Sequence, residues 1–203
     1  MKCKLPVFFI LFLLGINVFV LIKFRQYIKR TTLYINVLQN NPDELNALKL
    51  NTEVAIENSN IQLENVMVTD SKNAQKPLRS FFKSGQSKFL VCRFSDMHCE
   101  SCVEYAIKAT LQWSDSIGEN NILFLGTHRN RKIFSKQIKA YGIDKFTTVN
   151  VSSLNLPAEE LCFPYYFVLD STLTVLNVSI PDKGVRNVDH RYFQKIQKKF
   201  FKL

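Results

Sequence analysis

Two cysteines, Cys99 and Cys102, stand three positions apart, directly after a run of apolar residues that is typical of a buried strand. A Cys-x-x-Cys pair at the first turn of a helix favours redox chemistry, because the unpaired N–H groups and positive end of the helix stabilise a thiolate. This spacing puts both sulfurs on one helix face, within reach of a shared disulfide. We expect Cys99 to be the nucleophile and Cys102 the resolving thiol, with their redox-active disulfide in place of any separate cofactor.

The two residues beside the leading cysteine carry ionisable side chains that we expect to modulate its acidity. A protonated His98 would lower the pKa of the Cys99 thiol, whereas the negative charge of Glu100 would raise it. These two effects oppose each other. The redox potential of the pair therefore does not follow from the sequence.

Metal binding is the alternative chemistry for the same stretch. The soft ligands that such a site would use are Met97, His98, Cys99, Cys102 and Cys162. A structural zinc site would need two more ligands at paired spacing, and the sequence has no second Cys-x-x-Cys and no His-x-x-x-His. Redox chemistry without a metal is therefore the preferred interpretation. Cys92, inside the apolar run, is expected to be an inert core residue.

The elements around the pair alternate between strand and helix patterns. Strands are predicted at 61–68, at the apolar run from 89, at 121–126 and at 146–151, and helices from 102 to a stop at Gly118 and at 131–141. This order predicts right-handed crossovers and a largely parallel centre. Residues 165–170 and 173–180 then predict an antiparallel hairpin, and 189–203 a closing amphipathic helix.

The N-terminal run, residues 5–22, is uncharged and just long enough to span a bilayer. A cleaved signal peptide is the alternative, but basic residues follow the run in place of a cleavage site. We therefore expect one N-terminal transmembrane helix within an anchor at 1–30, a stalk at 31–58 and the main domain at 59–203. Disulfide chemistry suggests that this domain lies on the extracytoplasmic, periplasmic side.

The formal net charge of +10 does not indicate nucleic-acid binding. Six of the 27 basic residues flank the N-terminal apolar run, which leaves 21 basic against 17 acidic residues in the remainder. Basic residues gathered beside an apolar run suit a membrane surface. We expect a monomer that contacts the membrane through residues 5–22 and binds no nucleic acid.

With these residues in view, residues 59–203 resemble the thioredoxin superfamily, and within it the TlpA/ResA-like membrane-anchored thiol-disulfide oxidoreductases. The resemblance is carried by Cys-Glu-Ser-Cys after an apolar strand, by the element order, and by Phe163-Pro164 before the hairpin. It implies an α/β thioredoxin-like fold, with a central mixed sheet flanked by helices. It also implies a cis Pro164 that faces the cysteines and, with Phe163, docks substrate.

The same resemblance implies an enzyme that exchanges dithiol and disulfide with protein substrates and with an upstream redox partner. Two positions depart from the pattern, because His98 and Ser101 stand where many members carry Trp and Pro. The alternative function is a metal-handling or redox-silent binding module on the same fold.

Overall fold

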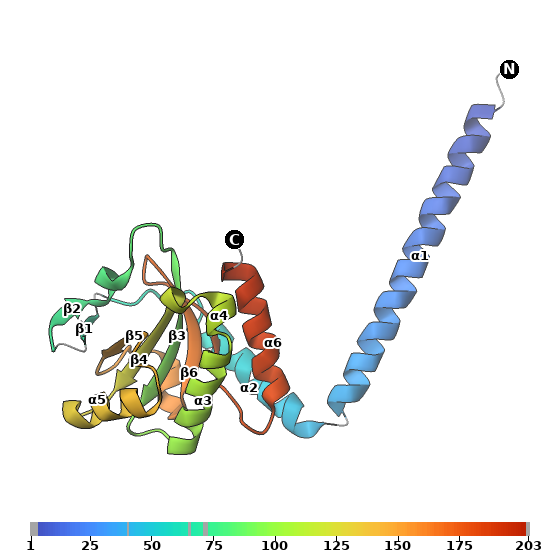
Figure 1. Ribbon diagram of the computed structural model, residues 1–203. Coiled ribbons are helices and arrows are strands. Elements are labelled where there is room, and N and C mark those ends of the chain that lie inside the picture. Colours follow the sequence, from blue (N-terminus) through green and yellow to red (C-terminus); the bar gives the residue numbers. More distant parts are fainter. Residues whose placement is uncertain (1–3, 40, 65, 71–72, 202–203) are drawn as a thin grey trace. The chain divides into compact units, whose positions relative to one another are not determined.

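The computed structural model describes residues 4–39, 41–64, 66–70 and 73–201 (Figure 1). The chain divides into two compact units, Met1–Leu45 and Asn46–Leu203. Helix α1 (Lys4–Gln39) makes up most of the first unit, and α2 (Pro42–Asn58) begins there and continues into the second. The second unit contains every strand of the described residues.

Helix α1 includes the residues predicted to span a membrane, but the helix does not end with them. It continues through the basic residues Lys23, Arg25, Lys29 and Arg30. Among the described residues, no helix combines the length and the apolar character that a membrane crossing needs. The transmembrane helix predicted at 5–22 is therefore not supported.

A seven-stranded mixed sheet forms the centre of the second unit, in the order β2-β1-β5-β4-β3-β6-β7. Its strands are β1 (Met67–Thr69), β2 (Gln75–Pro77), β3 (Lys88–Ser95), β4 (Ile122–Thr127), β5 (Thr147–Asn150), β6 (Tyr165–Asp170) and β7 (Val175–Ser179). Strands β3, β4 and β5 run parallel, whereas β6 lies antiparallel to β3 and to β7. The parallel centre and the C-terminal hairpin predicted from the sequence are confirmed.

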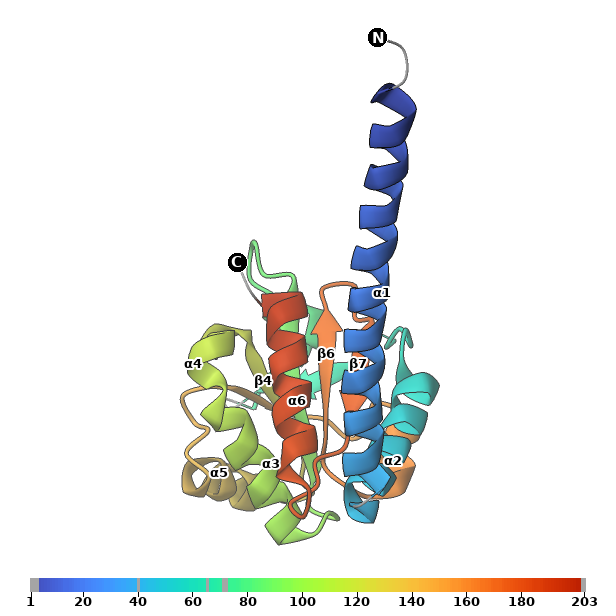
Figure 2. The same cartoon turned by 90° about the vertical axis from the view of Figure 1, so that its right-hand side faces the viewer.

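The helices of the second unit cover both faces of this sheet. Besides α2 they are α3 (Glu100–Gln112), α4 (Ser114–Ile117), α5 (Arg131–Ala140) and α6 (Arg186–Ile196), which a π-helical turn η4 (Gln197–Phe201) extends. Short 3-10 helices are η1 (Leu78–Phe81), η2 (Glu119–Asn121) and η3 (Pro157–Leu161). Figure 2 shows α3 and α6 side by side in front of the sheet.

Alternation along β3 divides the core into two apolar layers, because successive side chains of a strand point to opposite faces. Leu90, Cys92 and Phe94 pack with buried residues of α3, α5 and α6. Phe89 and Val91 lie in the other layer, with buried residues of α2 and η3. Strand β3 is therefore buried on both faces, which holds its C-terminal end, and the loop after it, in a fixed position.

The strand predicted at 61–68 is found only in part, as β1. The chain near Asn60 bonds to the β7 side of the sheet, where Asn60 N donates to Val175 O at 2.8 Å and Leu63 N donates to Leu173 O at 2.9 Å. Residues 67–69 instead pair with β2 and β5 at the opposite edge. The segment crosses from one edge of the sheet to the other, and this crossing interrupts the strand. Strand β2 was not predicted.

Candidate active site

Strand β3 delivers the two cysteines to the start of α3. The strand ends at Ser95, three loop residues follow, and Cys99 is the N-cap residue of α3. The backbone carbonyl of Cys99 accepts hydrogen bonds from the N–H groups of Cys102 and Val103, each at 3.0 Å. No side chain caps this helix end. Its positive pole therefore lies beside the Cys99 sulfur, as the sequence predicted.

The Cys99 thiol is exposed and unusually acidic. Its Sγ lies 3.2 Å from Ser101 Oγ. Hydrogen bonding from the Cys102 thiol, then from the Ser101 hydroxyl, lowers the pKa of Cys99 from 9.0 to about 7. A large fraction of Cys99 is therefore thiolate near neutral pH, the form that attacks disulfides.

Cys102 has the opposite properties. Its side chain is half-buried on the first turn of α3, and burial, followed by the hydrogen bond that it shares with Cys99, raises its pKa. Ionising both sulfurs together is unfavourable because two like charges would lie side by side. One thiol is thus exposed with a lowered pKa, and the other lies half-buried beside it with a raised pKa.

His98 differs from its predicted electrostatic role. Burial and the nearby Arg93 guanidinium lower the pKa of His98 from 6.5 to about 4, so the imidazole is neutral at pH 7. A neutral ring exerts no charge effect on Cys99, and the expected acidification by an imidazolium is not supported. Glu100 is exposed in the first turn of α3, where its carboxylate meets the positive end of the helix. Its effect on Cys99 stays a prediction.

Phe163 and Pro164 lead directly into β6, beside β3. Phe163 is 45% exposed, whereas Pro164 is buried. The described residues contain no cis peptide bond, so the cis geometry expected for Pro164 is wrong. Two residues earlier, at the end of η3, Cys162 adopts the left-handed conformation with φ 55°.

A cavity of about 220 Å³ is lined by both Phe163 and Cys102. Cys102 and Tyr105 of α3 line one side, and Lys183 lines it from the segment between β7 and α6. Ala47, Leu50, Ile180 and Pro181 contribute apolar surface. The structure therefore brings Phe163 and Cys102 to one depression, although they are 61 positions apart in the sequence.

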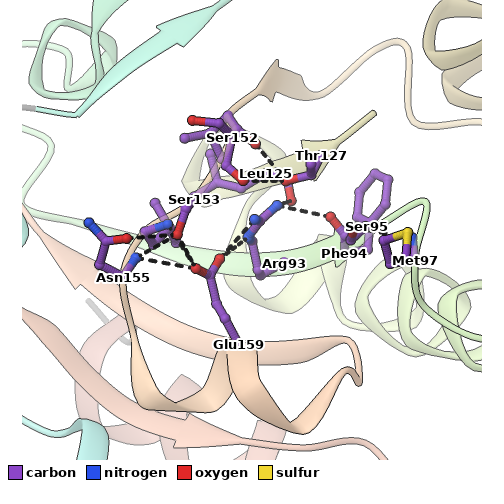
Figure 3. Close-up of polar contacts among 12 residues, drawn as sticks. Arg93, Phe94, Ser95, Met97, Leu125, Thr127, Ser152, Ser153, Asn155 and Glu159 are labelled. Atoms are coloured by element: carbon purple, nitrogen blue, oxygen red, sulfur yellow. Dashed lines mark hydrogen bonds and ion pairs between the residues drawn. The ribbon is translucent and has the colours of Figure 1, made fainter. Parts of the chain in front are cut away.

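A partly buried ion pair connects β3 to the loop before Phe163 (Figure 3). The Arg93 side chain is only 4% exposed, and its Nη2 and Nε donate to Glu159 Oε1 at 2.8 and 3.0 Å. Arg93 Nη1 also donates to the carbonyl of Phe94 at 3.0 Å. Glu159 belongs to η3, so this pair holds the loop that ends in Phe163 against the strand that ends before Cys99.

The other carboxylate oxygen of Glu159 orders the start of the same loop. Glu159 Oε2 accepts hydrogen bonds from Ser153 Oγ at 2.6 Å, Leu154 N at 3.0 Å and Asn155 N at 3.2 Å. This network was not predicted from the sequence. An arginine inside an apolar strand was the available signal, because a buried guanidinium requires a partner.

The remaining described cysteines lie apart from this chemistry. Cys92 is fully buried in β3, and burial raises its pKa from 9.0 to about 12, as expected for an inert core thiol. Cys162 is exposed at the end of η3. Throughout the part of the chain that the structure describes, no three His, Cys, Asp or Glu side chains form a group suited to a metal ion. His98, Cys99, Cys102 and Cys162 therefore form no such group of three.

Comparisons with known proteins give matches by structure only. No protein family model and no curated protein matches the sequence. A thiol:disulfide interchange protein from Bacteroides sp. superposes with a TM-score of 0.51 at 15% identity, covering 70% of this chain and 90% of that protein. The thioredoxin domain of a thiol-disulfide oxidoreductase from Bacteroides vulgatus gives 0.48 at 15% identity, covering 66% and 97%. A peroxidoxin from Mycobacterium tuberculosis gives 0.48 at 10% identity, covering 68% and 97%.

At such low identity the first of these superpositions is informative about architecture alone. The match extends over 70% of this chain, which includes a mixed sheet with helices on both faces. The chain therefore has a thioredoxin-like α/β fold.

Proposed function

We propose that the protein is a thiol-disulfide oxidoreductase that acts on protein thiols and disulfides through Cys99 and Cys102. The observation that carries the proposal is the contrast between the two sulfurs: an exposed thiol with a pKa near 7 beside a half-buried thiol with a raised pKa. The solved structure with a TM-score of 0.51 is itself a thiol:disulfide interchange protein. The narrower resemblance to TlpA/ResA-like proteins stays a prediction.

The reductive direction proceeds in two displacements. The Cys99 thiolate attacks one sulfur of a substrate disulfide, forming a mixed disulfide and releasing the other substrate sulfur as a thiolate, which takes up a proton. Cys102 then loses its proton and attacks Cys99 Sγ. This second step forms the Cys99–Cys102 disulfide and releases the second substrate thiol, so that two electrons have moved to the substrate. The oxidative direction is the same sequence reversed.

Phe163 and the cavity beside Cys102 support docking of a substrate segment next to the reacting sulfurs. The exposed Phe163 ring offers apolar surface, and the cavity walls from α2 and from the end of β7 extend that surface. Pro164 is assigned to the same docking edge, with a trans bond in place of the cis bond expected from the resemblance.

Trapping of mixed disulfides tests the assignment of the two roles. Cys102→Ser should accumulate covalent adducts with substrate proteins, visible on non-reducing gels and lost on reduction, because attack occurs and resolution does not. Cys99→Ser should accumulate few. Cys162→Ser is the matched control, since it removes another exposed thiol and should leave the adducts of Cys102→Ser unchanged when the two are combined.

The opposite trapping pattern would reverse the assignment, and adducts that disappear with Cys162→Ser would place the reactivity outside the pair. Absence of adducts together with a Cys99–Cys102 disulfide that does not form in glutathione buffers would reject the proposed function.

The proposal includes no cofactor besides the two cysteines. It also places the domain outside the cytoplasm, where digestion by protease added to intact spheroplasts is expected and full protection would contradict it.

A further inference from the structure

A lysine distant in sequence reaches the cysteine pair through a serine. Lys183 lies between β7 and α6, and its Nζ donates to Ser101 Oγ at 2.9 Å. The same oxygen lies 3.2 Å from Cys99 Sγ. Ser101 is thus shared between an ammonium group and the nucleophilic sulfur.

The bond from the ammonium group uses the Ser101 oxygen as an acceptor. An ammonium group has donors and no acceptor, so the Ser101 oxygen must accept the bond from Lys183. The single hydroxyl hydrogen of Ser101 is then free to point at Cys99. We propose that Lys183 is a positioning residue of this site: it orients the Ser101 hydroxyl as a hydrogen-bond donor to the Cys99 thiolate and increases the strength of that donor.

This proposal rests on the proposed function and adds an influence on the direction of electron transfer between the cysteine pair and its substrate. A thiolate is a strong acceptor, whereas a sulfur in a disulfide carries no charge and accepts hydrogen bonds weakly. The Lys183–Ser101 contact therefore stabilises the reduced form more than the oxidised form. A dithiol stabilised in this way makes its disulfide a stronger oxidant. Ser101 occupies the position where many proteins that the sequence resembles carry proline, which has no hydroxyl to offer.

Several other ionisable groups lie near the two sulfurs. On α3 these are Glu100 and the Cys102 thiol, and in the segment with Lys183 there is Asp182, which lines the same cavity. His98, just before the pair, is neutral at pH 7. Lys183 also lowers the pKa of both cysteines directly through its charge. This direct charge effect does not require Ser101. The proposed effect, which we call the relay, acts through the Ser101 hydroxyl and does require it.

A double-mutant cycle distinguishes the relay from the direct charge effect. The variants are Ser101→Ala, Lys183→Met and their combination in the full chain. The readout is the pH dependence of Cys99 alkylation by iodoacetamide, followed by peptide mass spectrometry so that the other thiols do not interfere. Lys108→Met is the matched control, because this lysine is exposed on α3 and pairs with Glu104.

Ser101→Ala should raise the apparent pKa of Cys99 by about one unit, a roughly tenfold smaller thiolate-to-thiol ratio near neutral pH. Lys183→Met should also raise it, and by more in the wild-type background than in the Ser101→Ala background, where only the direct effect of the lysine charge is left to lose. Equilibration with glutathione should show disulfides that are harder to reduce in both single variants. Lys108→Met should change neither quantity.

Two results would overturn the relay. If Lys183→Met shifts the titration equally with and without Ser101, the lysine acts through its charge alone. If Ser101→Ala leaves the titration unchanged, the hydroxyl does not bond the thiolate. Both results leave the proposed function intact, because that function is judged separately by trapping and by reversible disulfide formation in the wild-type protein.

Discussion

Asp189 is a buried carboxylate that contacts α3, and its raised pKa should make the stability of the protein depend on pH. This residue of α6 is 3% exposed, and its Oδ2 accepts a hydrogen bond from the Tyr105 hydroxyl of α3 at 2.8 Å. Its Oδ1 is buried and has no partner in the described part of the chain. Burial raises the pKa of Asp189 from 3.8 to about 7, although the bond from Tyr105 lowers it. Asp189→Asn removes the charge and keeps an oxygen to accept from Tyr105.

The sign of the pH effect follows from which state binds more protons. Because the pKa is raised in the folded state, the folded protein binds more protons than the unfolded chain between about pH 4 and pH 7, and stability falls as pH rises through that window. A shift of about three units corresponds to about 4 kcal/mol at its full extent. Asp189→Asn has no carboxyl group at this position and should not lose stability in this way as pH rises. Its stability relative to wild type should therefore increase by a few kcal/mol from pH 4 to pH 8.

Urea unfolding at several pH values measures this difference. The midpoints of wild type and Asp189→Asn should diverge as pH rises, with the variant more stable at pH 8. Asp115→Asn is the control, because Asp115 is exposed on α4 and its replacement should give a difference that is flat with pH. Tyr105→Phe should move the window to higher pH, since it removes the bond that favours the carboxylate. A difference between wild type and Asp189→Asn that does not vary with pH would refute the reasoning.

Three further substitutions test other parts of the structure. Arg93→Met should lower the free energy of unfolding by about 3 kcal/mol, because it leaves the partly buried Glu159 carboxylate without its cation. Chemical denaturation measures this loss, and a value below about 1 kcal/mol would contradict the prediction. His98→Ala should leave the pKa of Cys99 unchanged in alkylation profiles, and a rise would mean that the imidazole is charged after all. Gly126→Ala should lower the free energy of unfolding by about 1–3 kcal/mol in the same assay, because an added Cβ would overlap the buried ring of Phe134. Unchanged stability would show that the ring moves aside freely.

Local chemistry and periodicity made much of the fold predictable. Helix α5 shows why: Asn130 caps it by accepting from the N–H groups of Lys132 and Ile133, and the chain leaves it through Gly142 at φ 68°. Such signals lie within a few residues of the element that they define. Strand β2 and the break in the strand at 61–68 were missed, because both depend on pairing with distant strands.

Residue types and their spacing were enough to predict that a Cys-x-x-Cys pair follows a buried strand and starts a helix. The groups that surround that pair depend instead on how distant segments of the chain pack together. Lys183 meets Ser101 across 82 positions, and Glu159 meets Arg93 across 66. These contacts exist because β6, β7 and α6 fold back along β3 and α3, and the charge, burial and orientation that they impose on the thiols depend on distances in space that no local pattern records.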